Sequence, residues 1–312
     1  MSRSNMKNKK SVDCVVVTFN RLDLLKECVE AIENQTYPIE HFFIIDNCST
    51  DNTWEYLQSI KSEKIVPIHL EKNLGGAGGF NAGLKTFINK SDADYVWIMD
   101  DDTIPTSTAL EKLIDKSNIS SHLGFLCSNV RWQDNSVAVM NIPSPDKEWN
   151  KYSDQGVTKV KSASFVSIMF PRNVVKKVGY PITDFFIWGD DVEYTLRITH
   201  DYHLDGFMVN DSLVEHKIKQ NIATDLVKEE SLGRVKRYYL AQRNTIFYLK
   251  KHSTKKEVFK ATVRQGVKVP IKALIKSKDH RFYRAWVSVK GTAAGLFFNP
   301  KIEKVEKRDN FK

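Results

Sequence analysis

Apolar runs and amphipathic helical patterns alternate along the first hundred residues, and this alternation limits the possible folds more than any other feature. Three β-prone runs cover residues 13–19, 41–45 and 65–70, with helical patterns over residues 22–33 and 52–61 between them. Near-continuous apolar runs are typical of strands that are covered on both faces. The sequence therefore predicts an α/β, Rossmann-like fold, in which a mostly parallel central sheet has right-handed crossovers and flanking helices.

Polar segments follow each of these runs, at residues 18–21, 46–51 and 72–79. In open parallel sheets, ligands bind beyond the carboxyl ends of the strands. We therefore expect the polar segments to gather around a ligand at one edge of the sheet.

A fourth apolar run, residues 95–99, ends in three consecutive aspartates. Side chains alternate along an extended backbone, so Asp100 and Asp102 can point to the same side and share a cation, with Asp101 facing the other way. The alternative is a solvated acidic turn that caps the helix expected over residues 103–116. The triplet by itself does not decide between a metal site and a cap.

A glycine-rich stretch covers residues 73–83. It does not fit the dinucleotide-binding pattern, because Asn81 stands where the third glycine is required, and no Gly-Lys-Ser/Thr follows to make a P-loop. Glycines still permit positive φ and a close approach of backbone to a ligand. The helix that follows, through Leu84 and Phe87, has an N-terminus that favours an anion such as a pyrophosphate. A plain flexible loop is the alternative.

The second half of the chain alternates less regularly. We expect strands over residues 124–130, 161–170 and 206–214, a short helix over residues 171–178, and an irregular loop near the acceptor over residues 132–159. The last of these strands leads to His216. A lone histidine is more often structural than a metal ligand, and the other seven histidines show no metal-ligand spacing.

A second acidic group follows an aromatic run, in the sequence Phe-Phe-Ile-Trp-Gly-Asp-Asp-Val-Glu of residues 185–193. On a helix that begins near Asp190, Glu193 has the spacing of a capping box and forms an i,i+4 pair with Arg197. Capping accounts for one aspartate but hardly for both Asp190 and Asp191. A carboxylate at a helix N-terminus beside aromatic side chains can serve as a general base toward a sugar hydroxyl.

The positive charge of the chain is concentrated in its last part. Residues 250–312 carry 18 Lys and Arg against 5 Asp and Glu, a net charge of +13, so residues 1–249, with 29 against 33, carry −4. Apolar residues recur at helical spacing between the lysines of residues 254–298. Basic helices with apolar faces suit the surface of an anionic membrane, and packing on the main domain is the alternative. No nucleic-acid-binding motif accompanies this charge.

Cysteine usage and hydropathy indicate a cytoplasmic protein. The four cysteines lack CxxC spacing, no apolar signal-peptide core appears near the N-terminus, and no run approaches the roughly 18 apolar residues of a membrane span. If the protein meets a membrane, it does so from the surface. We divide the chain into a disordered leader (residues 1–11), a catalytic domain (12–230) and a basic helical region (231–312).

Three motifs taken together resemble a known family. Val-Val-Thr-Phe-Asn-Arg, Ile-Ile-Asp-Asn-Cys-Ser-Thr-Asp and Trp-Ile-Met-Asp-Asp-Asp, in this order, are similar to the inverting nucleotide-sugar glycosyltransferases of family 2, which have the GT-A fold. The resemblance covers about residues 12–217. The glycine-rich stretch and Trp-Gly-Asp-Asp-Val-Glu are more narrowly similar to the galactofuranosyltransferase and rhamnosyltransferase-like branch. There the acidic pair more often follows the Trp directly, so Gly189 is a departure.

The resemblance implies roles for particular residues. A Mn²⁺ or Mg²⁺ ion would bind Asp100, Asp102 and His216. Asp191 would be the general base, with Asp190 contacting the acceptor and Trp188 forming a platform for a sugar face. The nucleotide and donor sugar would lie against Thr18, Asn20, Arg21, Asp46, Asn73, Gly75, Gly76, Gly79, Asp100 and Asp101.

The resemblance also implies a reaction. We expect a hexosyltransferase that moves galactofuranose from UDP-galactofuranose onto a hydroxyl of a lipid-linked bacterial cell-surface glycan, at the inner face of the cell membrane. The nearest alternatives keep the fold and use dTDP-rhamnose or UDP-galactopyranose. A catalytically silent nucleotide-binding subunit is an alternative of another class, against which the full set of acidic residues argues. Whether the chain forms a homo-oligomer stays open.

Overall fold

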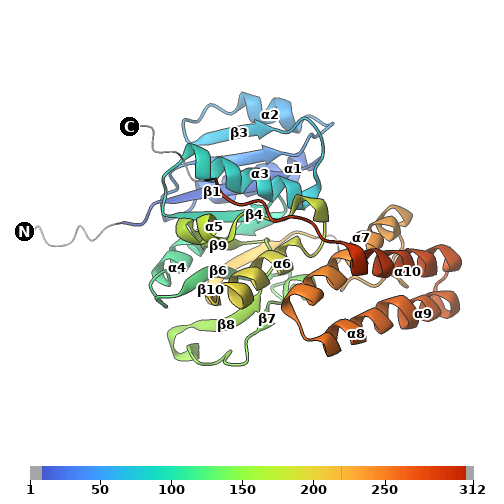
Figure 1. Cartoon of the computed structure of the whole chain (residues 1–312). Helices are drawn as coiled ribbons and strands as arrows, with labels where there is room; N and C mark the ends of the chain where they lie inside the picture. The colour runs from blue at the N-terminus through green and yellow to red at the C-terminus, as the bar shows by residue number, and fades with distance from the viewer. Residues whose placement is uncertain (1–8, 219, 307–312) are drawn as a thin grey trace, which may run out of the picture.

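A ten-stranded mixed β-sheet lies between layers of helices in the computed structural model, which describes residues 9–218 and 220–306 (Figure 1). The strand order is β3-β2-β1-β4-β9-β6-β10-β8-β7, and β5 pairs with β10 at one side. Most of the expected disordered leader falls outside the described residues. The predicted α/β fold is confirmed, with a parallel core, flanking helices and additional C-terminal helices.

The first half of the sheet is parallel, as the alternation of apolar runs predicts. Its strands are β1 (Val12–Thr18), β2 (Phe42–Asp46), β3 (Ile65–His69) and β4 (Tyr95–Asp100), which pair in register through parallel ladders. The crossover helices are α1 (Leu22–Glu33), α2 (Thr53–Ser59) and α3 (Gly75–Lys90). Every residue of β1 and β2 is buried, because α1 covers one face and α3 the other. Two covered faces explain the unbroken apolar runs.

The second half of the sheet is mixed. β9 (Ile168–Pro171) runs antiparallel between β4 and β6 (Leu123–Arg131), and β6 is parallel to the long β10 (Asp205–His216). The remaining strands pair antiparallel at the edge: β5 (Thr103–Pro105), β7 (Ser144–Pro145) and β8 (Val157–Ser162).

Two of the predicted elements are wrong in their bounds. The single strand expected over residues 161–170 is two strands, β8 and β9, separated by residues 163–167, where Thr195 bonds to both backbone groups of Ala163. The helix expected over residues 103–116 begins later, as α4 (Ala109–Asp115), because Thr103–Pro105 pair with β10. The expected irregular loop contains two short 3₁₀ helices, η1 (Val139–Asn141) and η2 (Ser153–Gln155), with β7 and the start of β8.

Short helical elements follow β9, and α6 among them carries the acidic pair. They are α5 (Arg172–Val178), the 3₁₀ turn η3 (Thr183–Phe185), α6 (Asp190–Leu196) and the π turn η4 (Arg197–Asp201). After β10, the long helix α7 (Leu232–His252) returns to pack against α6.

A C-terminal helical layer projects from one side of the sheet (Figure 1). Its members are α8 (Lys255–Val263), the π turn η5 (Arg264–Lys268), α9 (Val269–Lys276) and α10 (Arg281–Phe297). The chain then runs back over the sheet, where the Tyr180 N–H donates to the Glu303 carbonyl at 2.9 Å. Among the described helices, not one is both long enough and apolar enough to cross a bilayer.

Candidate active site

The carboxyl ends of β1 and β4 bring a threonine, an arginine and three carboxylates together. The Thr18 hydroxyl donates to Asp101 Oδ2 at 2.8 Å. The Arg21 guanidinium donates to Asp101 Oδ1 at 3.1 Å and to Asp102 Oδ2 at 2.6 Å. Burial raises the pKa of Asp101 to about 6 although Arg21 opposes this rise. The carboxylate of Asp101 therefore holds Thr18 and Arg21 in place, and the same Arg21 nitrogen also binds Asp102, so these two carboxylates converge on one guanidinium instead of facing opposite ways.

The third carboxylate, Asp100, belongs to the same electrostatic cluster. Burial and the charges of Asp102 and Asp101 raise its pKa well above the usual value, and the more distant Asp190 adds to this rise. Three carboxylates face one guanidinium, so the cluster carries a net charge of −2 when His216 is neutral and the carboxylates are ionised. One divalent cation would neutralise it.

The hydrogen bonds of His216 test whether a metal fits. Its Nδ1 lies 2.8 Å from Asn141 Oδ1, and Asn141 donates its Nδ2 to the Ser164 hydroxyl at 3.1 Å, so Asn141 offers His216 an acceptor. Nδ1 of a neutral His216 then carries the proton, and its Nε2 lone pair points at Asp102 Oδ1, 3.2 Å away. Asp102 Oδ1 is buried, and within the described part of the chain no donor other than the His216 ring lies within hydrogen-bond distance of it. Two electron-pair donors that face each other fit a shared cation.

The ends of β1 and β2 meet through reciprocal bonds. Asn20, at a positive φ of 54°, donates its amide to the Thr50 hydroxyl at 3.2 Å and accepts the Thr50 N–H at 2.7 Å. Beside them opens a cleft of about 450 Å³, which provides space for part of a nucleotide. It is lined by Asn20, Arg21, Leu22, Asp23, Leu24, Asp51 and Asn52.

Asp46 lies beneath this surface instead of on it. Its side chain is fully buried, with one oxygen 2.7 Å from His69 Nδ1 and the other accepting the Ser49 N–H at 3.0 Å. The half-exposed His69 ring contacts Trp54, with 4.9 Å between the ring centroids. Direct contact of Asp46 with a base or ribose stays a prediction, and the structure presents His69 as the accessible group at this strand end.

The glycine-rich stretch is not a loop, since its glycines form the first turns of α3. Asn73 Oδ1 accepts the Gly75 N–H at 2.7 Å and so anchors the helix start. A Cβ on Gly79 would lie 2.4 Å from Val17, so this glycine lets α3 pack directly on β1. At Gly76 a Cβ would meet no described atom within 4 Å. The open side of the helix N-terminus therefore lies at Gly76, whereas Gly79 faces the sheet.

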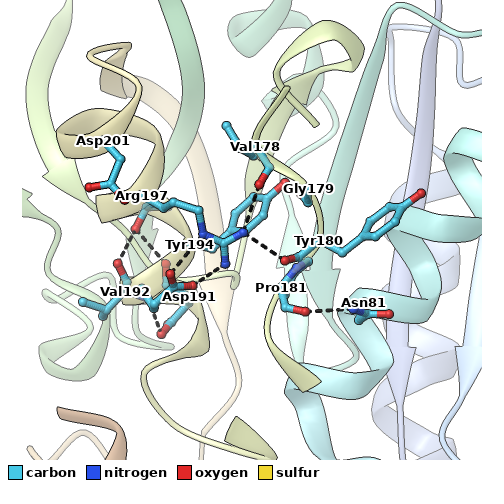
Figure 2. A network of polar contacts seen from close by, with 12 residues as sticks. Asn81, Val178, Gly179, Tyr180, Pro181, Asp191, Val192, Tyr194, Arg197 and Asp201 are labelled. Carbon is cyan, nitrogen blue, oxygen red and sulfur yellow. Dashed lines mark hydrogen bonds and ion pairs between the residues drawn. The ribbon is translucent and has the colours of Figure 1, made fainter. Parts of the chain in front are cut away.

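The acidic pair begins α6, as predicted. Gly189, at a φ of 89°, is the N-cap residue, and burial raises the pKa of Asp190 to about 8 and that of Asp191 to about 6. The expected i,i+4 pair of Glu193 with Arg197 is confirmed as a buried ion pair, whereas the capping box is wrong, because the N-cap residue Gly189 has no side chain to complete it. Arg197 also donates to the carbonyls of Val178 and Tyr180 at 3.2 and 3.0 Å (Figure 2).

Three buried asparagines near the site hold other residues in place, and the sequence did not predict these roles. Asn141 orients His216, Asn47 holds the N-terminus of α3 through Leu74 N and Gly75 O, and Asn244 bonds to the loop before Asp190. Trp188, the predicted sugar platform, packs edge-on against Tyr238, with 5.1 Å between the ring centroids. The available signal for Asn244 was a polar residue on the apolar face of a helix.

The arrangement of the sheet and its flanking helices is that of the GT-A fold. The chain is similar to mannosyltransferase PcManGT from Pyrobaculum calidifontis, solved with GDP-Man and Mn²⁺: the TM-score is 0.54 at 15% identity, over 92% of this chain and 76% of that one. It is also similar to GalNAc-T7, solved with UDP, GalNAc and Mn²⁺, with a TM-score of 0.55 at 12% identity, over 80% and 54% of the two chains.

The family follows from the sequence itself. The model of glycosyl transferase family 2 matches residues 13–179, more than half of the chain. The chain therefore belongs to glycosyltransferase family 2, and it transfers a sugar from a nucleotide donor. This confirms the resemblance that the strand-end motifs indicate.

Two curated relatives illustrate the range of this family. Galactofuranosyltransferase GlfT1 of Mycolicibacterium smegmatis is 26% identical over 215 residues, which are 62% of this chain and 67% of that protein. Poly-beta-1,6-N-acetyl-D-glucosamine synthase of Staphylococcus aureus is 24% identical over 210 residues. The match covers 66% of this chain but only about half of the synthase, 48% of its length.

Proposed function

We propose that this enzyme transfers galactofuranose from UDP-galactofuranose to a hydroxyl of a lipid-linked bacterial cell-surface glycan, with inversion at the anomeric carbon. The observation that supports the reaction type is a contact between the loop before the acidic pair and the glycine-rich N-terminus of α3, where the Phe186 carbonyl accepts the Ala77 N–H at 3.2 Å. The similarity to galactofuranosyltransferase GlfT1 favours the donor sugar.

The reaction is a single displacement. The acceptor oxygen attacks the anomeric carbon, a C–O bond forms, and the bond between that carbon and the diphosphate oxygen breaks on the opposite face. The acceptor proton passes to Asp191, whose pKa of about 6 leaves it mostly ionised at neutral pH. Asp190, with its pKa raised to about 8, is mostly protonated there and can donate to an acceptor oxygen.

The leaving diphosphate needs positive charge around it. Asp100, Asp102 and His216 would hold Mn²⁺ or Mg²⁺, which would supply this charge in the way metal ions do in such displacements. Arg21 is the cation that the chain itself contributes at this strand end, and its bonds to Asp101 and Asp102 fix its position. The N-terminus of α3, open at Gly76, offers backbone N–H groups to the same anion.

The donor is tested by thermal unfolding with a panel of nucleotide sugars. UDP-galactofuranose, UDP-galactopyranose and dTDP-rhamnose are added separately, each with Mn²⁺, and donor hydrolysis is measured in parallel. A ligand at 100 times its Kd stabilises the folded state by about 2.7 kcal/mol. We expect the largest shift and the fastest hydrolysis with UDP-galactofuranose. A larger response to dTDP-rhamnose would assign the enzyme to the rhamnosyltransferase branch instead.

We propose further that the enzyme works on the inner face of the cytoplasmic membrane, and the C-terminal layer carries a surface suited to this. Apolar residues recur every four positions along α8, η5 and α9, all of them exposed except the half-buried Val263, and an exposed basic residue follows each of them. The apolar members are Phe259, Val263, Val267, Ile271 and Ile275, and the basic members are Lys260, Arg264, Lys268, Lys272 and Lys276.

The π turn η5 helps to keep these two rows on one face. A spacing of four residues on an α-helix of 3.6 residues per turn drifts by about 40° at each step. η5 lies in the middle of the rows, and its wider turn takes back part of the accumulated drift. The arrangement matches the interfacial helices that place apolar side chains among acyl chains and lysines among anionic headgroups.

The outer face of α10 adds large aromatic side chains. Phe282, Trp286 and Phe297 are 85%, 59% and 87% exposed, although the inner face of the helix is tightly packed. A Cβ on Gly291 would lie 2.6 Å from the Tyr239 carbonyl of α7, so the two helices touch through their backbones. The packing of α10 on α7 therefore does not use these aromatic side chains. We propose an anionic bilayer as their partner, because the charge around them is positive.

Vesicle binding of the full chain tests this surface. We expect sedimentation with phosphatidylglycerol-containing vesicles but not with pure phosphatidylcholine. Lys268→Gln with Lys276→Gln should weaken binding about 30-fold, at about 1 kcal/mol for each lysine. Phe282→Ser with Trp286→Ser should weaken it at least as much. Lys61→Gln with Lys64→Gln, two exposed lysines of the sheet domain, is the matched control.

Donor hydrolysis should be unchanged in all of these variants, because they lie outside the catalytic site. If the wild type and the Phe282→Ser, Trp286→Ser variant bound anionic vesicles equally well, the proposed membrane contact would be wrong. A lipid-independent dimer that dissociates in the aromatic variant would show that the face joins two copies of the chain.

A further inference from the structure

The loop that leads into the acidic pair, residues 183–189, has an unusual backbone. Phe186, Trp188 and Gly189 have φ values of 64°, 65° and 89°. Positive φ is costly for a bulky aromatic residue and persists only where the surroundings impose it. Phe186 and Trp188 both have this conformation shortly before Asp190, so neighbouring elements must hold the loop in shape.

One buried side chain of α7 reaches three carbonyls of this loop. Asn244 is fully buried, and its Nδ2 lies within hydrogen-bond distance of three loop carbonyls: Phe185 at 3.1 Å, Ile187 at 3.1 Å and Trp188 at 2.8 Å. The orientation of the amide is fixed, because Arg243 Nε donates to its Oδ1 at 3.0 Å. Asn244 Nδ2 must therefore face the loop.

Arg243 binds the same loop from its other end. Its Nη2 donates to the Asp184 carbonyl at 2.6 Å. Its guanidinium carbon lies 4.0 Å from the ring centroid of Phe298, the first residue after α10, which also packs against Phe185. The C-terminal layer thus supports the arginine that fixes the Asn244 amide.

The opposite side of the loop rests on the donor side of the site. The Phe186 carbonyl accepts the Ala77 N–H of α3 at 3.2 Å, and a Cβ on Gly75 would lie 1.9 Å from that carbonyl oxygen. The loop therefore lies between the N-terminus of α3 and the side chains of Arg243 and Asn244 on α7, and it is hydrogen-bonded to both. A shift of the loop would move the acidic pair relative to the glycine-rich end of α3.

We propose that Asn244 is a positioning residue for the acidic pair: by binding the carbonyls of Phe185, Ile187 and Trp188, it sets the direction in which Asp190 and Asp191 face the acceptor. It touches neither substrate. Burying an amide is costly unless its bonds are made, and within the described part of the chain the three acceptors of the Asn244 Nδ2 all belong to this loop. The assignment rests on the proposed function, because the pair is taken as base and acceptor contact.

Helix α6 itself is held separately. The buried ion pair of Arg197 with Glu193 does not involve Asn244. Nor do the bonds of Arg197 to the Val178 and Tyr180 carbonyls, which Figure 2 shows. Loss of Asn244 should therefore loosen the loop and tilt the acidic pair while the helix stays folded. A misplacement of about 1 Å can lower a rate about 10²-fold.

Asn244→Leu, which keeps the approximate volume and removes the donors, is compared with Gln242→Leu on the same helix. Gln242 is buried against α10, near Gly291, and serves as the control for the packing of α7. We expect kcat for sugar transfer to fall about 100-fold in Asn244→Leu, with the Kd for UDP changed by less than about twofold. Amide hydrogen exchange over residues 185–191 should accelerate at least tenfold. Gln242→Leu should leave kcat, the Kd for UDP and the exchange rate unchanged.

Three outcomes separate the possibilities. Unchanged exchange over residues 185–191 in Asn244→Leu would overturn the positioning role. A similar loss of kcat in Asn244→Leu and Gln242→Leu would do the same, since it would show a general packing effect. Failure of the proposed function would instead appear as absent turnover by the wild-type enzyme with each donor of the panel, and the exchange measurement would still test the loop.

Discussion

Replacing Asp191 with Asn is expected to lower kcat for sugar transfer about 10³-fold while leaving the Kd for UDP within about twofold of the wild type. Asn has the shape of Asp but cannot take the acceptor proton, and general-base catalysis typically contributes 10²–10⁴-fold. Calorimetry with UDP and a transfer assay with the same preparation give the two numbers. Wild-type turnover in Asp191→Asn would exclude this residue as the base.

The matched control is Asp184→Asn. Asp184 is an exposed residue of the same loop. Arg243 contacts the backbone carbonyl of Asp184, which the substitution keeps. The substitution removes one negative charge near the acidic pair without touching either aspartate. We expect kcat to stay within about twofold, so a large loss in Asp191→Asn alone would reflect proton transfer instead of local charge.

The pH dependence follows from the same residue. Burial raises the pKa of Asp191 to about 6, so the ionised form that accepts the proton is lost as the pH falls through about 6. Below that value kcat should fall about tenfold per pH unit. The pKa values of Asp190 and Asp191 are both raised above those of the unfolded chain, so ionisation of the pair lowers the free energy of unfolding as the pH rises from about 4 to about 8. Asp191→Asn should flatten that decline.

The parallel half of the fold could be predicted because burial on both faces leaves a local trace. The residues of β1 alternate between the α1 side and the α3 side, and both sides demand apolar side chains. The break between β8 and β9 left no such trace. Residues 163–167 include Phe165 and Val166, which are as apolar and buried as the strands, so periodicity cannot locate the turn. The glycine-rich helix is a case of tertiary packing overriding a weak intrinsic preference.

The candidate site divides in the same way. The meeting of Asp101 and Asp102 with Thr18 and Arg21 could be predicted, since strand ends meet at one edge of a parallel sheet whatever the details of the loops. The asparagines that orient them could not. Asn141 lies 75 positions from His216, and Asn244 lies 56 to 59 positions from the carbonyls that it binds. A pairing over that distance depends on the assembled fold, and the local sequence around either asparagine carries no sign of it.

Removal of divalent metal is the second change with a large expected effect. Excess EDTA should lower turnover more than 10²-fold, and Mn²⁺ or Mg²⁺ should restore it, because the charge on the leaving diphosphate would otherwise be poorly offset. Without any substrate, Mn²⁺ at 100 times its Kd should raise the Tm by about 5 °C. His216→Ala should weaken Mn²⁺ more than Mg²⁺, since imidazole suits the softer ion. His122→Ala, an exposed histidine, is the control. Full turnover in EDTA would contradict the metal assignment.

Asp102→Asn separates a metal site from a plain ion pair. In the wild type, Asp102 Oδ1 and His216 Nε2 are 3.2 Å apart, and both are acceptors when His216 is neutral. Asn at position 102 can donate its amide to Nε2 while its oxygen still accepts from Arg21. The metal-free variant should therefore unfold at the same or a higher temperature than the metal-free wild type, and Mn²⁺ should no longer raise its Tm. If a protonated His216 simply paired with Asp102, the variant would lose that pair, its Tm would fall, and the wild type would not respond to Mn²⁺.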